Sequence, residues 1–408
     1  MNTSSNQWLV ALLGARMHYA VPRILHQSNL LKHLYTDICA VKGCPKLLHT
    51  IPKSLQPSNL KRLLGRVPEG IPTENITAFN SFGFKYAQKL RQARSPSEAT
   101  QVFLWAGKTF CQLILEEGFG EASGIYTFNT AGLEVLQSAR QQGLITVTEQ
   151  TIAPKAIEYQ LLQQEYQAFP DWESPLEEDP FLLELSAREK EEWSTADVIL
   201  CGSEFVREGI IACGGAAERC KILPYGVDAR FLLPEHLPHA GSLRVLTIGG
   251  VGLRKGSPYV LAAAKKLQGL ATFRMVGPLG IQPEMKSVLA SHVELTGTVP
   301  RSQILNHYAW ADVFLLPSIC EGSATVIYEA LAAGLPVICT PNAGSVVRNG
   351  VEGFIVPIRN YEAIADKLEL LAINLDLRHE MSKNARQRAS EFTLNAYKQR
   401  LLKILANI

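Results

Sequence analysis

DVFLLPSICEGSATVIYEALAAGLPVICTP, residues 312–341, contains the pattern that decides the fold. An apolar strand leads into a loop that carries Glu321 and Gly322, and a helix then starts near Ser323 and is closed by Gly334. A second apolar strand follows, so two strands are joined by one helical crossover. This order is typical of a parallel sheet that is covered by helices.

The same alternation of short apolar strands and amphipathic helices extends in both directions along the chain. The apolar segments lie at 125–129, 144–150, 196–206, 221–228, 244–250, 271–278 and 293–297. We therefore predict an α/β protein with two doubly wound, Rossmann-like domains, residues 1–225 and 226–391, that face each other across a cleft. The carboxyl ends of both parallel sheets open into such a cleft, so the ligand is expected there.

Two connecting segments stand apart from this alternation. Residues 223–239 contain three prolines and are interpreted as the linker between the domains. Residues 154–180 are less regular and include Asp171-Trp172-Glu173 and Glu177-Glu178-Asp179. They are either a mobile flap over the cleft or a solvated acidic loop.

The loop and helix start within residues 317–329 suit an anionic ligand. Free backbone amides and the helix dipole favour a diphosphate there, and Gly322 and Ser323 allow the backbone to approach it closely. Glu329, inside the helix, can accept two hydrogen bonds from the vicinal diol of a ribose. Glu321 precedes the helix, at the place where a sugar ring would lie. The alternative is that Glu321 and Glu329 are two solvated surface glutamates without a role in ligand binding.

The Glu321-GSATVIY-Glu329-ALAAGLPV motif resembles the signature of glycosyltransferase family 4, the group 1 retaining enzymes with the two-domain GT-B fold. The resemblance extends from about Ala196 to Pro357 and includes LPYGVD, LRKG and NGVEGFIVP. It implies that Glu321 contacts the transferred sugar, and that Gly322, Ser323 and Ala324 line the donor site. It also implies that the C-terminal helix, 392–408, packs back onto the first domain.

The glycine-rich segment IGGVGLRKGS, 248–257, follows a strand and opens a helix. Two adjacent cations, Arg254 and Lys255, are disfavoured at a helix start unless an anion such as a diphosphate neutralises them. The family resemblance assigns Lys255 to the donor phosphates, with Gly252 in the same loop, and plain surface charge is the alternative. We expect Lys255, Glu321 and Glu329 to face one cavity, and Arg301 to be an unrelated surface residue.

A dinucleotide-binding site is disfavoured for the same segment. Gly250, Gly252 and Gly256 resemble a nicotinamide-cofactor fingerprint, but the next strand ends in Val276-Gly277-Pro278 where an acidic residue should bind the ribose. The family resemblance instead implies that Gly277 lines the cleft and that the backbone of Val299 meets the nucleobase. Ordinary strand-ending turns are the alternative for both.

The N-terminal domain supplies candidates for the acceptor side. Gly14, Arg16 and His18 follow the first predicted strand, and Glu149 and Gln150 end the strand 144–150. In the family a glycine at the first place lets sugar and acceptor approach the backbone, and a histidine is common at the second. Here Glu149 or Gln150 is expected to bind sugar hydroxyls instead.

These residues predict a hexosyltransferase that moves a sugar from a nucleotide-diphosphate sugar to a carbohydrate, lipid or small-molecule acceptor. Retention of the anomeric configuration is implied by the family resemblance. No Asp-x-Asp pair occurs, so Arg254, Lys255 and backbone amides are expected to neutralise the diphosphate without a metal or other cofactor. A catalytically silent scaffold of the same fold and a nucleotide-sugar epimerase remain as alternatives.

Composition sets the remaining expectations. The 408 residues are 47% hydrophobic and 19% charged, with a net charge of +2, which gives no basis for nucleic-acid binding. The eight cysteines show no zinc-ligand spacing and suit a reducing compartment. Trp8–Ala15 reads as a buried strand rather than a signal peptide. A cytoplasmic enzyme is predicted, with peripheral contact to the inner face of the membrane left open.

Overall fold

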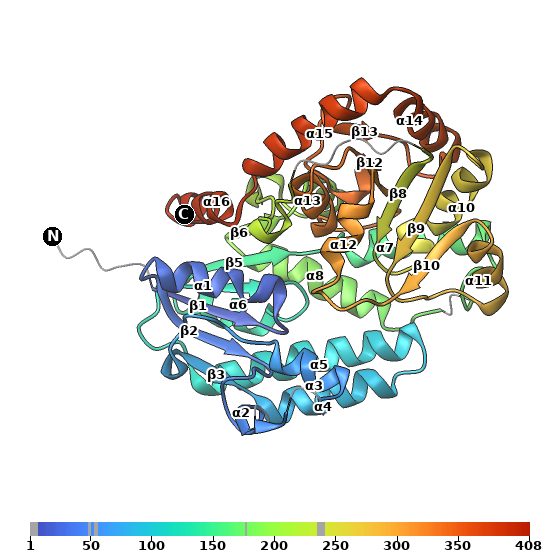
Figure 1. Cartoon of the computed structure of the whole chain (residues 1–408). Coiled ribbons are helices and arrows are strands. Elements are labelled where there is room, and N and C mark those ends of the chain that lie inside the picture. The colour runs from blue at the N-terminus through green and yellow to red at the C-terminus, as the bar shows by residue number, and fades with distance from the viewer. Residues whose placement is uncertain (1–6, 48–49, 53–55, 176–177, 235–240) are drawn as a thin grey trace.

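Two parallel β-sheets form the centres of two lobes, one below the other in Figure 1. The computed structural model describes residues 7–47, 50–52, 56–175, 178–234 and 241–408. Within these residues the first sheet has seven strands in the order β3-β2-β1-β4-β5-β6-β7, and the second has six in the order β10-β9-β8-β11-β12-β13. We refer to the lobes built on them as the N-lobe and the C-lobe.

The N-lobe alternates strands and helices. Its strands are β1 (Trp8–Leu12), β2 (Leu31–Thr36), β3 (Ile76–Ala78), β4 (Gly124–Phe128), β5 (Ile145–Gln150), β6 (Val198–Cys201) and β7 (Cys220–Ile222). Its part of the sequence also forms α1 (Ala20–Gln27), α2 (Cys44–Leu47), α3 (Ser58–Leu64), α4 (Asn80–Gln92), α5 (Pro96–Glu117), α6 (Leu133–Gln141), α7 (Lys155–Ala168), α8 (Leu182–Thr195) and α9 (Glu204–Ala212).

The C-lobe repeats the pattern. Its strands are β8 (Leu243–Ile248), β9 (Ala271–Val276), β10 (Val293–Gly297), β11 (Val313–Leu316), β12 (Val337–Cys339) and β13 (Gly353–Ile355). The helices are α10 (Ser257–Lys266), α11 (Pro283–Ala290), α12 (Ile304–Trp310), α13 (Thr325–Ala332), α14 (Tyr361–Ile373), α15 (Leu375–Ser390) and α16 (Leu394–Leu405). In the described part of the chain, no helix combines the length and the apolar character that a bilayer crossing requires.

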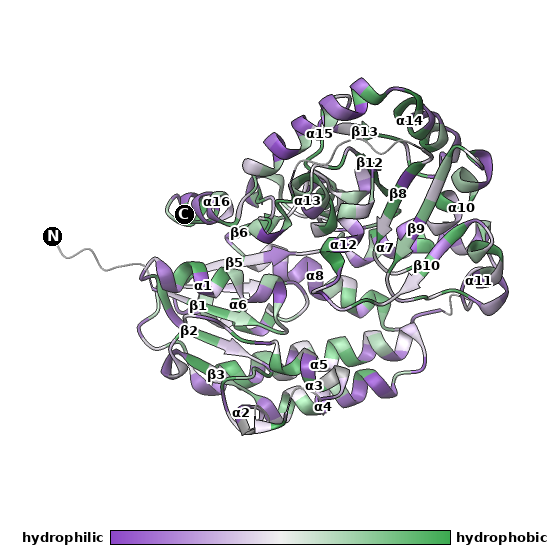
Figure 2. Ribbon diagram, in the orientation of Figure 1, coloured by the Kyte–Doolittle hydropathy of each residue, from purple (hydrophilic) through white to green (hydrophobic). Residues whose placement is uncertain are grey.

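Hydrophobic residues occupy the strands and the helix faces that cover them. Figure 2 shows α13 almost entirely green, whereas the exposed side of α15 is purple. The strand segments VFLL of β11 and VIC of β12 are buried along their whole length, as expected for inner strands that are covered on both faces. The core therefore lies in the middle of each lobe, and the strand ends that face the other lobe are left for loops.

The chain returns from the C-lobe to the N-lobe at its C-terminus. The backbone N–H of Val227 donates to the carbonyl of Phe392 at 2.8 Å, and Arg400 of α16 donates to the carbonyl of Pro224 at 3.3 Å. The ring of Tyr397, which is fully buried, lies 6.4 Å from that of Tyr225. Helix α16 thus packs beside the N-lobe although it follows the C-lobe in sequence (Figure 1).

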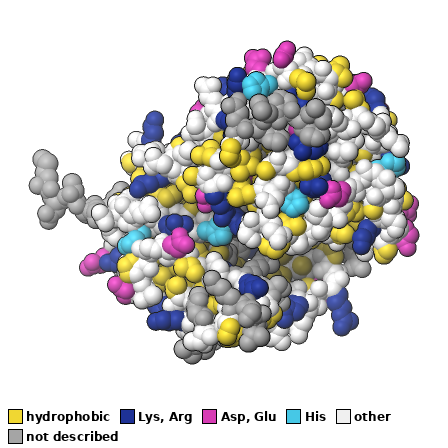
Figure 3. Space-filling model, viewed as in Figure 1, with side chains coloured by type: hydrophobic (Ala, Val, Ile, Leu, Met, Phe, Trp, Pro, Cys, Tyr) yellow, Lys and Arg dark blue, Asp and Glu magenta, His cyan; other side chains and the backbone are white. Residues whose placement is uncertain are grey.

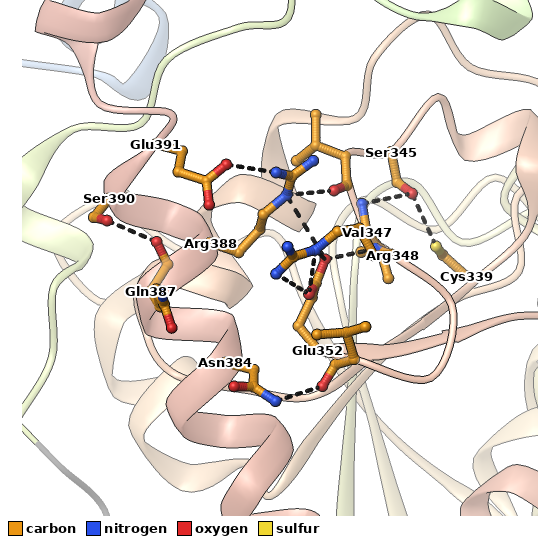
Figure 4. Close-up of polar contacts among 12 residues, drawn as sticks. Cys339, Ser345, Val347, Arg348, Glu352, Asn384, Gln387, Arg388, Ser390 and Glu391 are labelled. Atoms are coloured by element: carbon orange, nitrogen blue, oxygen red, sulfur yellow. Dashed lines mark hydrogen bonds and ion pairs between the residues drawn. The ribbon is translucent and has the colours of Figure 1, made fainter.

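A buried glutamate fixes the loop between β12 and β13. Glu352 is fully buried and pairs with Arg348 at 3.0 Å and with Arg388 of α15 at 3.7 Å (Figure 4). Asn384 of the same helix donates to the carbonyl of Val351 at 3.0 Å. Because a buried carboxylate without partners is costly, these contacts hold the loop between β12 and β13 against α15.

The α/β fold with two facing, doubly wound sheets is confirmed, and so is the strand at 293–297. The helix expected near Ser323 begins at Thr325, because the preceding residue, Ala324, has an extended backbone with φ of −69° and ψ of 103°. The division at residue 225 stays a prediction. The described part of the predicted linker includes the 3-10 helix Ala229–Phe231, whereas residues 235–239 lie outside the described residues.

The interpretation of residues 154–180 as irregular is wrong for its first half. Residues 155–168 form α7, since this segment has no glycine or proline and consists mostly of good helix formers. Trp172 is buried and Glu173 is half-buried, so this part is not a solvated acidic loop. Glu177, which belongs to the predicted acidic cluster, lies outside the described residues.

Replacing Tyr397 with Ala is expected to lower the free energy of unfolding by about 3–5 kcal/mol, because it empties a fully buried site between α16 and the N-lobe. Urea unfolding monitored by circular dichroism measures the change. Gln399→Ala, at an exposed position of the same helix, is the control and should cost less than about 0.5 kcal/mol. Equal midpoints for the two variants would contradict this packing.

Candidate active site between the two lobes

The order of the strands brings two loops of the C-lobe together. β8 and β11 are neighbours, and the sheet reverses its winding between them, which is where α/β sheets open a crevice. The loop after β8 carries the short 3-10 helix η7 (Leu253–Lys255), and the loop after β11 carries Glu321. The backbone N–H of Ile319 donates to the carbonyl of Arg254 at 2.9 Å, so the two loops are in direct contact.

Arg254, Lys255 and Glu321 form one ion cluster. Arg254 Nη1 donates to Glu321 Oε1 at 2.8 Å, and Lys255 Nζ lies 2.7 Å from the same oxygen. Lys255 and Glu321 are each only 8% exposed. Burial lowers the pKa of Lys255 although Glu321 opposes the shift, whereas for Arg254 the attraction of Glu321 outweighs burial and raises the pKa. The cluster keeps charges of both signs at the crevice in partnered form.

Glu329 lies apart from this cluster. The hydroxyl of Tyr308 donates to Glu329 Oε2 at 2.8 Å. Burial raises the pKa of Glu329 above its ordinary 4.5, against the opposing effects of Tyr308, Arg301 and Arg230. Arg301 is exposed, as expected for a surface residue, and its charge lowers the pKa of Glu329.

Gly322 is the point where the lobes touch. It forms an isolated antiparallel bridge with Ile152, and a Cβ at Gly322 would collide with the carbonyl of Thr151. The hydroxyl of Ser203, the N-cap residue of α9, donates to the carbonyl of Gly322 at 2.5 Å. The bare backbone of Gly322 therefore admits the N-lobe, whereas we expected it to admit a ligand.

Ser323 and Ala324 are buried next to this contact. The hydroxyl of Ser323 lies 2.8 Å from that of Tyr328 and donates to the carbonyl of Gly344 at 3.0 Å. The backbone N–H of Ala324 donates to the carbonyl of Ala343 in the 3-10 helix η8 (Pro341–Ala343) at 3.1 Å. The loop after β12 thus supports the start of α13.

The other predicted donor-site residues follow strands β8, β9 and β10. A Cβ at Gly252 would collide with Glu173 Oε1, and one at Gly277 would collide with the carbonyl of Gly249. Gly277 is therefore needed for a contact within the protein, whereas a Cβ at Gly252 would displace the carboxylate of Glu173. Val299 is half-buried and packs beside the core that the two lobes share.

A cavity of about 240 Å³ lies between the lobes. Its walls consist of Arg16, Met17, Val21, Phe128, Glu149, Thr151, Tyr225, Ser323 and Thr325. The cavity reaches the start of α13, but Lys255, Glu321 and Glu329 are not among its lining residues. Their charged atoms bond partners inside the protein, and the expectation that the three residues face one cavity stays a prediction. Figure 3 shows basic and histidine side chains gathered near the middle of this face, over the seam between the lobes.

Arg16 and Glu149 bring opposite charges to the cavity. Arg16 Nη1 donates to the hydroxyl of Thr151 at 2.6 Å. The buried carboxyl of Glu149 accepts from the hydroxyl of Tyr225 at 3.0 Å and from that of Tyr126. Burial raises the pKa of Glu149 against the effect of these hydrogen bonds and of Arg16. The arrangement offers a cation and a hydrogen-bonded carboxyl to a polar ligand.

The structure does not bring Gly14, His18 or Gln150 to the cavity wall. Gly14, with φ of +101°, has open space where a Cβ would be, and its N–H donates to Asp37 at 3.1 Å. His18 is exposed, and burial together with Arg301 lowers its pKa. Side chains alternate along a strand, so Gln150 points away from the face of Glu149 and bonds Glu189 at 2.9 Å.

Three functional candidates have no signal in the sequence pattern. Tyr308 holds Glu329, Tyr225 holds Glu149, and Thr151 holds Arg16. Tyr225 lies in the LPYGVD segment, which the family resemblance includes without a role, and Tyr308 looks like any buried aromatic residue of a helix. In the described part of the chain, no three His, Cys, Asp or Glu side chains gather into a group that could hold a metal ion.

The chain is similar to known proteins both in sequence and in fold. Residues 231–388 match the family model described as glycosyl transferases group 1. We call residues 231–388 the group 1 domain after this match, which covers less than half of the chain. Sucrose-phosphate synthase from Thermosynechococcus elongatus superposes with a TM-score of 0.65 at 17% identity, covering 98% of each chain. HepE from Anabaena, in complex with UDP-glucose, superposes with a TM-score of 0.61 at 15% identity over 98% of this chain and 100% of its own. The chain has the GT-B fold.

The chain is also similar in sequence to curated glycosyltransferases. The colanic acid biosynthesis glycosyltransferase WcaL of Salmonella typhimurium is 26% identical over 231 residues, 52% of this chain and 57% of its own. An N-acetylgalactosaminyltransferase of Campylobacter jejuni that acts on a diphospho-undecaprenol compound is 30% identical over 165 residues, 39% of this chain and 43% of its own. The match thus spans about half the length of these relatives.

Lys255→Met is expected to lower the turnover of a nucleotide-sugar substrate by about 100-fold or more, because it removes a preorganised charge from the group 1 domain and keeps the buried side-chain stem. Released nucleotide measures the rate. Lys286→Met, at an exposed position of α11, is the matched control and should leave turnover unchanged. Equal rates for both variants would remove Lys255 from the site.

Nucleotide affinity is expected to fall as the pH is lowered, beginning above pH 4.5, because the raised pKa of Glu329 lets this carboxylate gain its proton early. A protonated carboxyl accepts fewer hydrogen bonds from a ribose diol. Calorimetric titration with UDP, GDP and ADP between pH 4.5 and 8 measures the effect, provided that circular dichroism shows the protein folded. Glu329→Gln should bind more weakly at pH 8 and lose this pH dependence. A variant that keeps the wild-type profile would rule out the ribose role.

Proposed function

We propose that this chain is a glycosyltransferase that moves a sugar from a nucleotide-diphosphate sugar to an acceptor hydroxyl, with retention of anomeric configuration and without a metal. The observation that carries the proposal is the ion cluster of Arg254, Lys255 and Glu321 at the crevice between β8 and β11 of a group 1 domain. HepE, of the same fold, has been crystallised with UDP-glucose, and this supports a nucleotide-sugar donor here.

The cluster can exchange its partners when a donor binds. A diphosphate beside η7 would compete for Lys255 and Arg254, since phosphate oxygens are strong acceptors for both cations. Glu321 would then be released to accept a hydrogen bond from a sugar hydroxyl. After the exchange the two cations are paired with the diphosphate and the carboxylate of Glu321 keeps a hydrogen bond, which limits the desolvation cost.

The two cations then act on the leaving group. As the bond between the sugar and the phosphate lengthens, negative charge grows on the diphosphate, and Lys255 and Arg254 stabilise it in a largely buried setting. Glu329 would hold the ribose from the other side of the α13 start. The donor would then lie along the helix N-terminus, where the dipole favours its phosphates.

The cavity on the N-lobe side is the proposed place of the acceptor. Arg16 and Glu149 present a cation and a carboxyl to it, and Ser323 and Thr325 bring the wall up to the donor loop. Met17, His18 and Tyr19 of the adjoining loop all have positive φ, which costs on the order of 1 kcal/mol for each residue. Such strain in a loop beside the cavity supports a role in binding. Relatives that act in polysaccharide synthesis and on a lipid diphosphate make carbohydrates and lipids the first acceptors to test.

The decisive experiment incubates the protein with UDP-, GDP- and ADP-sugars, with and without oligosaccharide or lipid-linked acceptors, in EDTA. Transfer from one donor class, with the product retaining its anomeric configuration by NMR, is the expected result. Sugar altered without an acceptor would indicate an epimerase, and nucleotide binding without turnover would indicate a silent scaffold. Activity that returns only on adding a divalent metal would overturn the metal-independent mechanism. Lys255→Met serves as the inactive control.

A further inference from the structure

The segment 155–174 comes from the N-lobe in sequence but packs on the C-lobe. It follows β5 and precedes α8, yet α7 contacts η7 of the C-lobe. Trp172 belongs to the C-lobe core, and Leu161, Tyr166 and Phe169 pack against that core. We name residues 155–174 the crossing segment, since the chain here leaves the N-lobe, covers part of the C-lobe and then returns.

A buried glutamate anchors the crossing segment to the C-lobe. Glu165 is fully buried and accepts from the hydroxyl of Tyr259 at 2.9 Å and from Arg359 Nε at 2.5 Å. Arg359 also donates to the carbonyl of Leu161 at 3.3 Å. Removal of one member of such a buried pair leaves an uncompensated charge, so the anchor resists separation.

The far end of the crossing segment reaches the loop of the ion cluster. The backbone N–H of Leu253 donates to Glu173 Oε1 at 2.5 Å, and the hydroxyl of Tyr166 donates to Glu173 Oε2 at 2.8 Å. The carbonyl of Trp172 accepts from the N–H of Gln282 at 2.8 Å. Glu173 is thus held by its own segment while it holds the first residue of η7.

Gly252 makes this contact sterically feasible. Its bare Cα faces Glu173 Oε1, and a Cβ would collide with that oxygen. The N–H of Gly252 donates to the hydroxyl of Ser257 at 2.8 Å. Two consecutive amides at the start of η7 are therefore bound by side chains, one from α10 and one from the crossing segment. A turn of three residues between glycines has little rigidity of its own, so these bonds define its shape.

We infer that Glu173 is a positioning residue of the donor site: it fixes the loop 250–256 so that Arg254 and Lys255 are presented to a diphosphate. The inference rests on the proposed function. Glu173 takes a backbone amide, whereas the side chains of Arg254 and Lys255 reach Glu321, so the carboxylate and the two cations use different partners. An acidic residue contributed by the N-lobe sequence would thereby set the phosphate-binding loop of the C-lobe.

The test compares Glu173→Ala and Glu173→Gln with Asp171→Ala, an exposed acidic residue two positions away. Calorimetric titration with UDP, GDP and ADP gives Kd. We expect Glu173→Ala to raise Kd at least tenfold and Glu173→Gln to stay within about threefold of wild type, because an amide oxygen still accepts from the N–H of Leu253. Asp171→Ala should match wild type. Urea unfolding identifies the conditions in which each variant is folded.

Gly252→Ala provides an independent route to the same defect, since its Cβ displaces the carboxylate. If it acts through Glu173, the double variant with Glu173→Ala should bind no more weakly than the weaker single variant, whereas additive losses would mean separate effects. Hydrogen exchange of the amides 250–256 can be measured without nucleotide. It should be faster than in wild type for Glu173→Ala, but not for Glu173→Gln or Asp171→Ala.

Two outcomes overturn the inference. Unchanged Kd and unchanged exchange in Glu173→Ala would show that the loop keeps its shape alone. Tighter binding would show that the carboxylate competes with the nucleotide for the loop. Wild-type protein that binds none of the three nucleotides would refute the proposed function itself, and this result is distinct because the exchange data would still report whether Glu173 fixes the loop.

Discussion

The need to pair two nearly buried charges of opposite sign organises the C-lobe. Lys255 and Glu321 lie on separate loops, and each would be expensive to bury without the other. They can meet because β8 and β11 are neighbours and because the sheet changes its winding direction between them. Gly249 is required beside them, since a Cβ there would collide with the side chain of Lys255. The strand order and the ion cluster are two aspects of one constraint.

The N-lobe obeys the same topological rule on its own side of the seam. Its sheet reverses between β1 and β4, and the loop after β1 supplies Arg16 to the cavity. The end of β5 adds Glu149, and Thr151 just beyond it contacts both Arg16 and Gly322. The switch points of the two sheets are therefore joined through a short path of bonded residues. A change in the loop of Gly322 will therefore first alter the contacts of Thr151 and Arg16 in the N-lobe.

The sequence was most informative where one segment carries both the strand pattern and the charged residue. In the C-lobe, charged residues in the loops after two strands indicate a binding site, namely Glu321 before α13 and Lys255 before α10. The roles assigned to these residues stay predictions, but their convergence followed from the strand order. The sequence did not indicate which of Glu149 and Gln150 faces the cavity. Side chains alternate along β5, so only one of two successive side chains can do so, and it is Glu149.

Long-range partners were beyond prediction from the sequence. Nothing local distinguishes Tyr308 as the partner of Glu329, or Glu165 as a buried anchor, because each needs a residue that the fold alone brings near. Helix α7 was missed for a related reason: it contacts α8 of its own lobe as well as η7 and the core of the other lobe, so its residues do not show the pattern of a helix that covers its own sheet. A segment with ordinary helix formers and an unclear apolar face is a candidate for packing between domains.

The crossing segment and α16 together constrain how the lobes can move. Each connects the lobes away from the chain that links β7 to β8, and each ends in buried aromatic or charged residues, Trp172 and Glu165 in one case and Tyr397 in the other. If the lobes separate at Gly322, the crossing segment stays with the C-lobe, because its anchors lie in that core. The loop of Arg254 and Lys255 would keep its Glu173 contact through such a motion, while Thr151 and Ser203 would leave Gly322, so the donor loop can stay formed while the acceptor side opens.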